Sequence, residues 1–416
     1  MILRNKSNSQ SGKQLPVCKK SSNFVRQTTN ELLLLCTTAT LSTERKERIS
    51  NKLTGKIDWD YLLKLVTFHG VAPLIAFNLS TEGLASQVPQ LYLNQLRQIY
   101  NNTIYKNVLL SNELAKILST FRQHGVDAIA LKGTILAEQL YGNPALRTVV
   151  DMDILVRSEQ LSIANSLLLD MSYEKVILTN AMNHPFHNEY CKNAKLPFFI
   201  ELHWNLDDQK LVAIPQQEIW QRAQMSQIQK VDTLLLSPED TLLLLCNNFS
   251  KPSDLLLKSL CDITTLIEKS SNILDWNYIA DSSRSWGINI STYYSLYRSK
   301  ELLRASVPEY VLEALKPGKW RCRLLNLLVN KEAFISTSKL NKLTIETYNL
   351  YRGLSMNHLH QTASILSNYR GSNGIWGKLR TVFWTILVFS TALGSTVVGR
   401  IYKSKWQVET SHLLIN

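Results

Sequence analysis

The chain has 416 residues, a length that predicts two or three domains. Apolar residues make up 45% and charged residues 19%, which is typical of a globular protein with a hydrophobic core. This composition excludes wholesale disorder, collagen-like repeats and a disulfide scaffold. The 6 cysteines are scattered without a CxxC pair, which favours a reducing compartment and leaves no cysteine-based zinc site.

The formal net charge of +13 is confined to the two ends of the chain. Residues 1–56 contribute +8 and residues 367–416 contribute +5, so the middle carries 29 basic and 29 acidic residues. A basic groove in the folded body is therefore not indicated, and we expect no specific nucleic-acid partner. Basic tails more often attract anionic lipid or keep a protein soluble.

The ends of the chain show no secretion signal. Residues 1–30 contain six basic residues and no acidic ones, without an apolar segment and cleavage site, and we predict that residues 1–28 are a disordered basic arm. Residues 381–399 are uncharged and long enough to span a bilayer, but eight of the nineteen are Thr, Ser or Gly and basic residues flank both sides. A membrane helix and a helix packed on the protein both stay open. We expect a cytoplasmic protein that makes weak contact with the inner face of the membrane through this run.

The first half of the chain begins with helical spacing. Residues 31–36 and 57–79 are predicted helices, the second with Leu62, Leu65, Val66 and His69 on one face. Another helix starts at Pro89, and together these segments define an N-terminal helical module over residues 29–111.

The hydrophobic period changes after an amphipathic helix over 112–124, which ends at a glycine. Segments 126–131, 149–156 and 197–203 are typical of strands. Short helices are expected between them at 133–140 and 158–171, the latter capped by Ser158. This alternation predicts an α/β core over residues 112–206.

The remainder is predicted to be helical. Ser237, Pro238 and an acid at the third position form a strong helix start, followed by helices at 241–247 and 254–268. We assign residues 207–370 to a C-terminal helical module and 371–416 to a basic and apolar C-terminal helix.

One internal echo connects the two helical regions. The segment Asp58-Trp59-Asp60-Tyr61-Leu62 recurs 217 residues later as Asp275-Trp276-Asn277-Tyr278-Ile279, and Gly70 recurs at the same offset as Gly287. A duplicated helical module on either side of the core and a chance match are both compatible with this pattern.

The strongest chemical motif is Asp151-Met152-Asp153. On a strand both carboxylates face one side, where their mutual repulsion favours a cation between them. Mg²⁺ prefers such hard oxygen ligands together with substrate phosphates. The ordinary alternative is two solvated acids at a strand end.

A later strand supplies a third carboxylate, Glu201, with His203 on the same face. Three carboxylates on neighbouring strands suit two metal ions that stabilise the attacking and leaving oxygens of an in-line displacement, whereas an edge-strand acid is the alternative. His203 is either a proton shuttle or a structural histidine that holds Glu201. If all three carboxylates serve such a site, their groups should lie within roughly 4–7 Å of one another.

The turn Lys132-Gly133-Thr134 lies where a strand leads into a helix. Glycine permits close approach, and the helix N-terminus, the lysine and the hydroxyl suit a triphosphate, although an ordinary tight turn is also possible.

Arg147 either contacts a phosphate or pairs with Asp151. His184 and His187 have HxxH spacing, but Pro185 disfavours a helix that would align them, so we do not expect a metal there. No GxSxG, HExxH, GxGxxG or Walker A motif is present.

Taken together, these motifs resemble the polymerase-β-like nucleotidyltransferases and, more closely, a family of uncharacterised bacterial nucleotidyltransferases. The similarity rests on the combination LKG, LR, DMDILV and ELHW, and extends from about residue 30 to about residue 310. It implies an α+β fold with a nucleotidyltransferase α/β core between helical modules. The chain departs from the pattern in its Gly133-Thr134 turn, in a longer spacing to Asp151, and in Cys246-Asn247-Asn248-Phe249, where histidines are usual.

The resemblance implies a reaction in which an NMP moves from an NTP to an acceptor with release of pyrophosphate. Asp151, Asp153 and Glu201 would hold two Mg²⁺ ions, and Lys132 and Gly133 would face the phosphates. The acceptor, whether a small molecule, a sugar, a lipid-linked intermediate, a peptide or a protein, is not implied. A non-catalytic nucleotide- or partner-binding protein with the same fold is the alternative, and a membrane-surface scaffold is compatible with either.

Overall fold

A computed structural model describes residues 17–81, 83–176, 185–251, 254–328, 334–335, 352 and 354–355. Residues 1–16 of the predicted arm, the predicted helix 371–416 and its uncharged run 381–399 lie outside these ranges. Within the described ranges, no helix combines the length and the apolar character that crossing a bilayer requires.

The N-terminal region is a group of helices. They are α1 (Val17–Cys36), α2 (Thr43–Leu53), α3 (Trp59–Phe68) and α4 (Ala72–Leu79). The four residues predicted for one face of segment 57–79, from Leu62 to His69, are all buried, which confirms that face.

The predicted disordered arm is wrong for residues 17–28, which belong to α1. Tertiary contacts hold this part of the helix: Thr29 accepts a hydrogen bond from the main-chain N–H of Asp58 at 3.1 Å, and the Arg26 guanidinium lies 5.3 Å from the centre of the Tyr61 ring. Composition alone does not show partners that lie 29 and 35 positions away.

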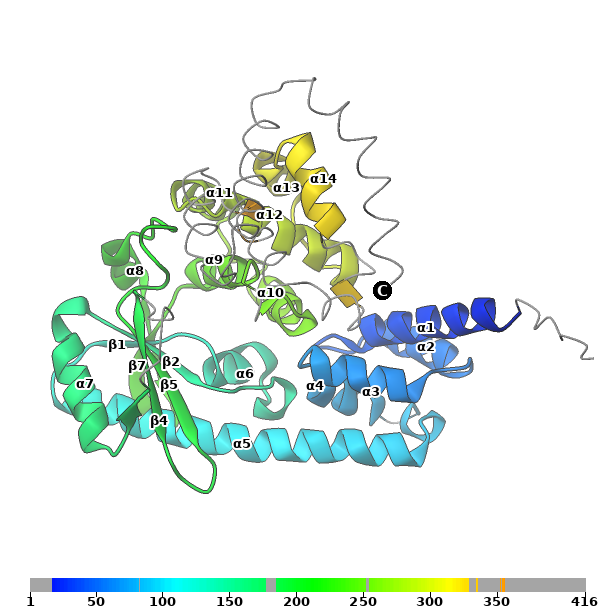
Figure 1. The fold of residues 1–416 in the computed structure, drawn as a ribbon, viewed down its shortest axis with the longest axis horizontal. Helices are drawn as coiled ribbons and strands as arrows, with labels where there is room; N and C mark the ends of the chain where they lie inside the picture. The colour runs from blue at the N-terminus through cyan, green and yellow to red at the C-terminus, as the bar shows by residue number, and fades with distance from the viewer. Residues whose placement is uncertain are drawn as a thin grey trace, which may run out of the picture.

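A single long helix, α5 (Gln90–Gln123), replaces the two helices expected on either side of residue 111. No glycine or proline interrupts this segment, so nothing breaks the helix. Figure 1 shows α5 extending from beneath the N-terminal helices to beneath the sheet, so the expected boundary at 111/112 lies inside a rigid element.

The core is a seven-stranded mixed sheet in the order β3-β4-β5-β2-β1-β7-β6. The strands are β1 (Ala128–Ala130), β2 (Met152–Val156), β3 (Glu174–Lys175), β4 (His187–Lys192), β5 (Phe198–His203), β6 (Gln224–Ile228) and β7 (Val231–Leu235). The central strands β2 and β5 are parallel, whereas β1–β2, β3–β4, β4–β5 and β6–β7 are antiparallel. Short helices α6 (Thr134–Tyr141), α7 (Leu161–Asp170) and α8 (Gln216–Arg222) connect them. Ser158 does not cap α7, because a short 3₁₀ turn over 158–160 precedes the helix.

The sheet extends past the expected core limit at residue 206. Strand β7 pairs in parallel with β1, so the β6–β7 hairpin belongs to the core and not to the C-terminal helical module. The hairpin turn consists of Gln229 and Lys230, both with positive φ (48° and 67°), where Asn-Gly or Asp-Gly is usual. The turn therefore carries no sequence signal.

The two faces of the sheet pack differently. Met152, Ile154 and Val156 of β2 pack with the C-terminal half of α5 and with α7, whereas Leu155 packs on the opposite side with α9 and its neighbours. Side chains alternate along a strand, so Asp153 shares the face of Leu155. The candidate site therefore lies on the face that the C-terminal helices cover.

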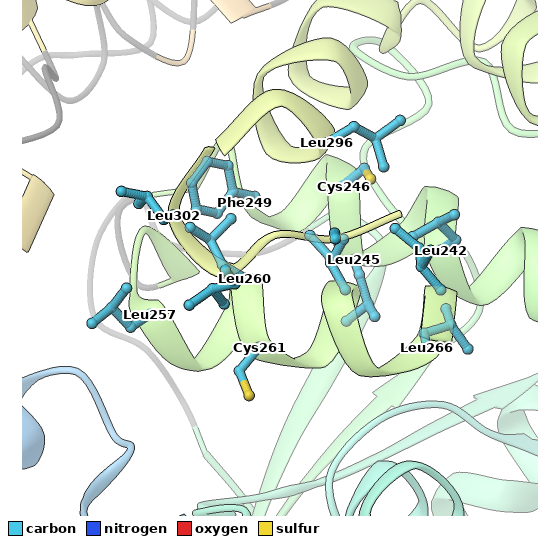
Figure 2. Packing of buried hydrophobic residues seen from close by; sticks show 14 of the residues in the cluster. Leu242, Leu245, Cys246, Phe249, Leu257, Leu260, Cys261, Leu266, Leu296 and Leu302 are labelled. Atoms are coloured by element: carbon cyan, nitrogen blue, oxygen red, sulfur yellow. The ribbon is translucent and has the colours of Figure 1, made fainter. Parts of the chain in front are cut away.

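The C-terminal helices are α9 (Pro238–Asn248), α10 (Leu257–Lys269), α11 (Trp276–Ser285), α12 (Asn289–Arg298), α13 (Glu309–Leu315) and α14 (Lys319–Leu328). The helix start predicted at Ser237 is confirmed, since its side chain accepts the N–H of Asp240 at 3.1 Å. Figure 2 shows the leucine-rich contact between α9 and α10, with Phe249, Leu260 and Leu302 at one end.

The internal echo has a counterpart in the elements. Helices α3 and α11 begin 217 residues apart, each capped by an aspartate side chain, Asp58 or Asp275. Each is followed by a glycine with positive φ (Gly70, 67°; Gly287, 78°), and α4 and α12 also begin 217 residues apart. The repeated pattern thus extends from sequence to element order.

Candidate active site

The carboxylates of Asp153 and Glu201 are placed together by the pairing of β2 with β5. These two residues are direct partners in the parallel register, and both lie on the face covered by α9. The next pair along the same face is Leu155 and His203. Parallel pairing of the DxD strand with the ELH strand therefore brings the expected acids side by side.

His203 links the two carboxylates. Its Nε2 atom lies 3.1 Å from Oε2 of Glu201 and 3.4 Å from Oδ1 of Asp153. Those two oxygens are no farther apart than the sum of these distances, which is within the roughly 7 Å expected for a shared metal site. Lys132, directly after β1, places Nζ 3.0 Å from the same Asp153 oxygen.

Asp153 is held in its charged form. Burial would raise the pKa of this carboxyl, but the Lys132 ammonium and the His203 ring outweigh burial and lower it. Burial likewise would lower the pKa of His203, yet its hydrogen bonds to Asp153 and Glu201 raise it. The buried Asp153 and His203 and the partly exposed Lys132 form one ionic cluster.

Asp151 behaves in the opposite way. Burial, followed by repulsion from Asp153, raises the pKa of its carboxyl to about 6, although Lys132 opposes this shift. Glu201 also contributes repulsion, so the three predicted carboxylates act on one another. A cation that joined them would relieve this repulsion.

The Lys132-Gly133-Thr134 turn requires its glycine. Gly133 caps α6 with φ 67° and ψ −125°, a conformation that L-residues rarely adopt, and an added Cβ would lie 3.0 Å from the carbonyl oxygen of Asp151. Thr134 is buried, and its hydroxyl finds no hydrogen-bond partner among the described residues. The glycine thus brings the turn against the segment that carries the first aspartate.

Arg147 pairs with Asp262 instead of Asp151. Its Nε atom lies 3.0 Å from each carboxylate oxygen of Asp262 in α10, and Nη1 donates to the Gly133 carbonyl at 3.1 Å. The guanidinium is buried, so in this structure Arg147 supports the turn from behind. The expected ion pair with Asp151 is therefore wrong, because a partner 115 positions away satisfies this charge, and the expected phosphate contact stays a prediction.

A cavity of about 270 Å³ opens beside the cluster. Its lining residues come from the turn, the β4–β5 edge and the C-terminal helices: Leu131, Lys132, Phe186, His187, Glu201, His203, Leu206, Leu244, Asn248, Lys251, Asp254 and Arg352. Gly133, Thr134, Asp151 and Asp153 do not line it, so the expectation that the glycine turn itself faces the cleft is met only at Lys132.

Lys251 and Arg352 form a cationic wall of this cavity, which their positions in the sequence did not indicate. Lys251 and Arg352 place their charged groups 3.1 and 3.7 Å from the buried carboxylate of Asp207, which also accepts from Asn247 at 2.6 Å. The amide nitrogen of Asn248 is buried without a hydrogen-bond partner among the described residues. The sequence feature that pointed to this part of the site was the Asn247-Asn248 pair, noted above as a departure from the family pattern.

His187 is the second residue that sequence reasoning set aside. Antiparallel pairing of β4 with β5 puts it opposite His203, with ring centres 4.8 Å apart. Pro185 disfavours a helix that would align His184 with His187. His187 instead begins strand β4, and the histidine next to it is His203 of β5. His184 lies outside the described residues.

A mixed sheet that pairs a DxD strand with an acid-bearing strand, beside a Lys-Gly turn opening a helix, is consistent with a nucleotidyltransferase-like α+β fold. Residues 55–304 match the model of the family described as uncharacterised nucleotidyltransferase, which is more than half of the chain. The chain belongs to this family of nucleotidyltransferases. The bacterial origin expected from the resemblance stays a prediction.

Two solved structures show distant similarity. One is an antigenic nucleotidyltransferase-like protein from Paracoccidioides brasiliensis, with 15% identity, a TM-score of 0.31, and coverage of 50% of this chain and 92% of that one. The other is a tRNA-processing enzyme in an apo form, with 15% identity, a TM-score of 0.27, and coverage of 67% and 78%. A search of curated proteins found no match.

Proposed function

We propose that the protein is a Mg²⁺-dependent nucleotidyltransferase that moves an NMP from an NTP to an acceptor hydroxyl or phosphate. The observation that carries this proposal is the pairing of Asp153 with Glu201 in adjacent strands, within electrostatic reach of Asp151, beside a cavity with a cationic wall. Family membership supports nucleotidyl transfer in general.

The donor set fits Mg²⁺. The three carboxylates offer hard oxygens, and neither oxygen of Asp153 accepts a hydrogen bond of normal geometry from the described residues. Asp151, Asp153 and Glu201 would hold the ions, which when bound neutralise phosphate charge and activate the attacking oxygen. Lys132 balances the charge of Asp153 in the structure as described.

The chain's own cations would hold the substrate's phosphates. The Lys132 side chain lies between Asp153 and the cavity and is free to exchange its carboxylate for a phosphate oxygen. Lys251 and Arg352, both paired with Asp207, line the same cavity. At about 270 Å³ the cavity is slightly below the roughly 300–1,000 Å³ of typical ligand pockets, so we expect the triphosphate to enter it and the nucleoside to stay nearer the opening.

The proposed step is an in-line displacement. An acceptor oxygen forms a bond to the α-phosphorus while the bond from that phosphorus to the α,β-bridging oxygen breaks. Pyrophosphate leaves with the bridging oxygen, and the proton of a hydroxyl acceptor passes to water. His203, which contacts both Asp153 and Glu201, positions these carboxylates; its role as a proton shuttle stays a prediction.

The competing function is nucleotide or partner binding without catalysis. The presence of all three acids favours catalysis, because a protein that only binds would have no use for repelling carboxylates next to its phosphate site. A scaffold at a membrane surface would depend on residues 381–399, which lie outside the described residues.

The test is label transfer from each α-³²P-NTP with Mg²⁺, with and without a cell lysate as a source of acceptors. Asp151→Asn is the sharpest variant: its raised pKa shows that the charge is disfavoured, so the substitution should leave the fold as stable as before. We expect transfer to fall about a hundredfold or more, since a lost metal ligand removes several kcal/mol of transition-state stabilisation.

Asp170→Asn, which changes an exposed carboxylate at the end of α7, is the matched control and should transfer normally. Asp153→Asn is less suitable, because it would leave the Lys132 ammonium without its partner and destabilise the fold. Nucleotide binding by the wild type without transfer to any acceptor, or full transfer by Asp151→Asn, would contradict the proposal.

A further inference from the structure

We propose that His187, Glu201 and His203 form a binding site for one divalent first-row transition-metal ion, such as Mn²⁺, Co²⁺ or Zn²⁺. This site is distinct from the Mg²⁺ site proposed above, although the two share Glu201. It requires no transferase activity and can be tested by itself.

The three side chains converge at the β4–β5 edge of the site. One ligand atom from each, an imidazole nitrogen of His187 and of His203 and a carboxylate oxygen of Glu201, lies within 4.8 Å of the other two. For bonds of about 2.0–2.2 Å to a common ion, the distance between any two of these atoms would need to shorten by at most about 2 Å. Small adjustments of the side chains, within the packing around them, would supply such a movement.

The strands hold the set in place. His187 and His203 are direct cross-strand partners, and Glu201 lies two residues before His203, so all three share one face. Both histidine side chains are buried, with 6% and 5% of their surface exposed. The Phe186 ring packs edge-on against His187 and stacks on His203, which limits the orientations of both imidazoles.

The donor chemistry selects against Mg²⁺. Two imidazoles and one carboxylate suit Mn²⁺, Fe²⁺, Co²⁺ and Zn²⁺, whereas Mg²⁺ prefers oxygen ligands alone. Glu189, with Oε1 3.7 Å from Nε2 of His187, supplies a second carboxylate beside the set and raises the local affinity for a cation.

An ion at this position would be open to ligands. Among the described residues, the three that offer these ligand atoms also line the cavity, so free coordination positions of the ion would face the space proposed for the phosphates. Closed structural sites have four protein ligands, so the geometry points to an ion that contacts substrate or water.

The ordinary explanation of the cluster is that His203 is a cation shared by Asp153 and Glu201, without a metal. That explanation requires no metal ligand from His187, whose Nε2 atom also lies 3.7 Å from Oε1 of Glu189. Removing the His187 imidazole therefore separates the two explanations.

The experiment uses full-length protein treated with a chelator, desalted, and titrated with Co²⁺ while visible absorption is recorded. We expect a saturable one-equivalent d–d band of a four- or five-coordinate site, displaced by Zn²⁺ but not by a thousandfold excess of Mg²⁺. Absence of such a band in the wild type would overturn the proposal, whatever the variants do.

His187→Ala should weaken Co²⁺ binding by at least about tenfold. The matched control is His124→Ala, which removes an exposed imidazole at the end of α5 and should bind as the wild type does. Unchanged affinity in a folded His187→Ala protein, checked by urea denaturation, would overturn the assignment. If that variant fails to fold, His187→Gln serves in its place, and equal Co²⁺ affinity would count against the site in the same way.

The result is independent of the proposed transferase reaction. Co²⁺ binding with no label transfer would support this site and contradict the proposed function. Mg²⁺-dependent label transfer with no Co²⁺ band would support the proposed function and contradict this metal site.

Discussion

The buried ion pair between Arg147 and Asp262 allows a direct test of whether this arginine supports the fold or binds substrate. Nε of Arg147 lies 3.0 Å from both carboxylate oxygens and Nη2 3.0 Å from Oδ2, with side-chain exposures of 7% and 2%. The Tyr141 hydroxyl donates to the same carboxylate at 2.8 Å. Burial by itself would lower the pKa of Arg147, but the Asp262 charge outweighs burial and raises it.

Arg147→Met removes one partner and leaves the buried carboxylate of Asp262 uncompensated. Breaking a buried pair in this way costs about 3–5 kcal/mol, whereas replacing both partners by apolar residues of similar volume is often close to neutral. We therefore expect Arg147→Met to lose about 3–5 kcal/mol of unfolding free energy, and the double variant with Asp262→Leu to recover most of it.

The assay is urea denaturation followed by circular dichroism on the four proteins of a double-mutant cycle. Their unfolding free energies are compared with a common m-value, the slope of free energy against urea concentration. Arg48→Met, which changes an arginine in an exposed pair on α2, is the control and should change stability little. If Arg147→Met keeps wild-type stability but loses NTP binding, the phosphate contact expected from the sequence is right and the structural role is wrong.

Three further outcomes follow from single residues. His69 accepts the N–H of Leu257 at Nδ1 and faces the Ile335 carbonyl with Nε2, and burial lowers its pKa to about 4. Because the unfolded chain takes up this proton near pH 6.5, stability should be complete above that pH and fall by up to about 3 kcal/mol as pH drops to 4, a dependence that His69→Gln should lack in urea titrations. Gly133→Ala should cost about 2–3 kcal/mol, since φ of 67° with ψ of −125° is strained for alanine and its Cβ meets a carbonyl oxygen at 3.0 Å; a thermal midpoint equal to the wild type would refute this. Ser237→Ala should cost about 1 kcal/mol of unfolding free energy by removing the N-cap of α9. A loss below the error of the denaturation measurement would show that the hydrogen bonds between Ser237 and Asp240 do not stabilise the fold.

Much of the local structure could be predicted because its causes are local. The start of α9 follows from Ser237 and Pro238, and the strands β2 and β5 follow from short apolar runs with alternating acids. The same alternation placed Asp153 and Glu201 on the faces where they are found. Parallel pairing of the two strands then brought them together, as the family resemblance implied.

What could not be predicted depends on partners distant in the sequence. The β6–β7 hairpin turns on Gln229 and Lys230, whose positive φ values are imposed by strand pairing and not by their own preference. The helical segment 17–28 contacts α3 through Arg26 and Tyr61, and the charge of Arg147 is satisfied by a residue of α10.

By itself, therefore, the sequence determined the elements with local signals, such as the start of α9 and the strands β2 and β5, and which acids share a strand face, since capping and alternation act over a few residues. Only the tertiary structure decided that Arg147 lies behind the turn, that Lys251 and Arg352 line the same cavity as Glu201, and that His187 meets His203. These juxtapositions follow from strand register and from the packing of α9 and α10 on the sheet, which bring together residues that no sequence spacing connects.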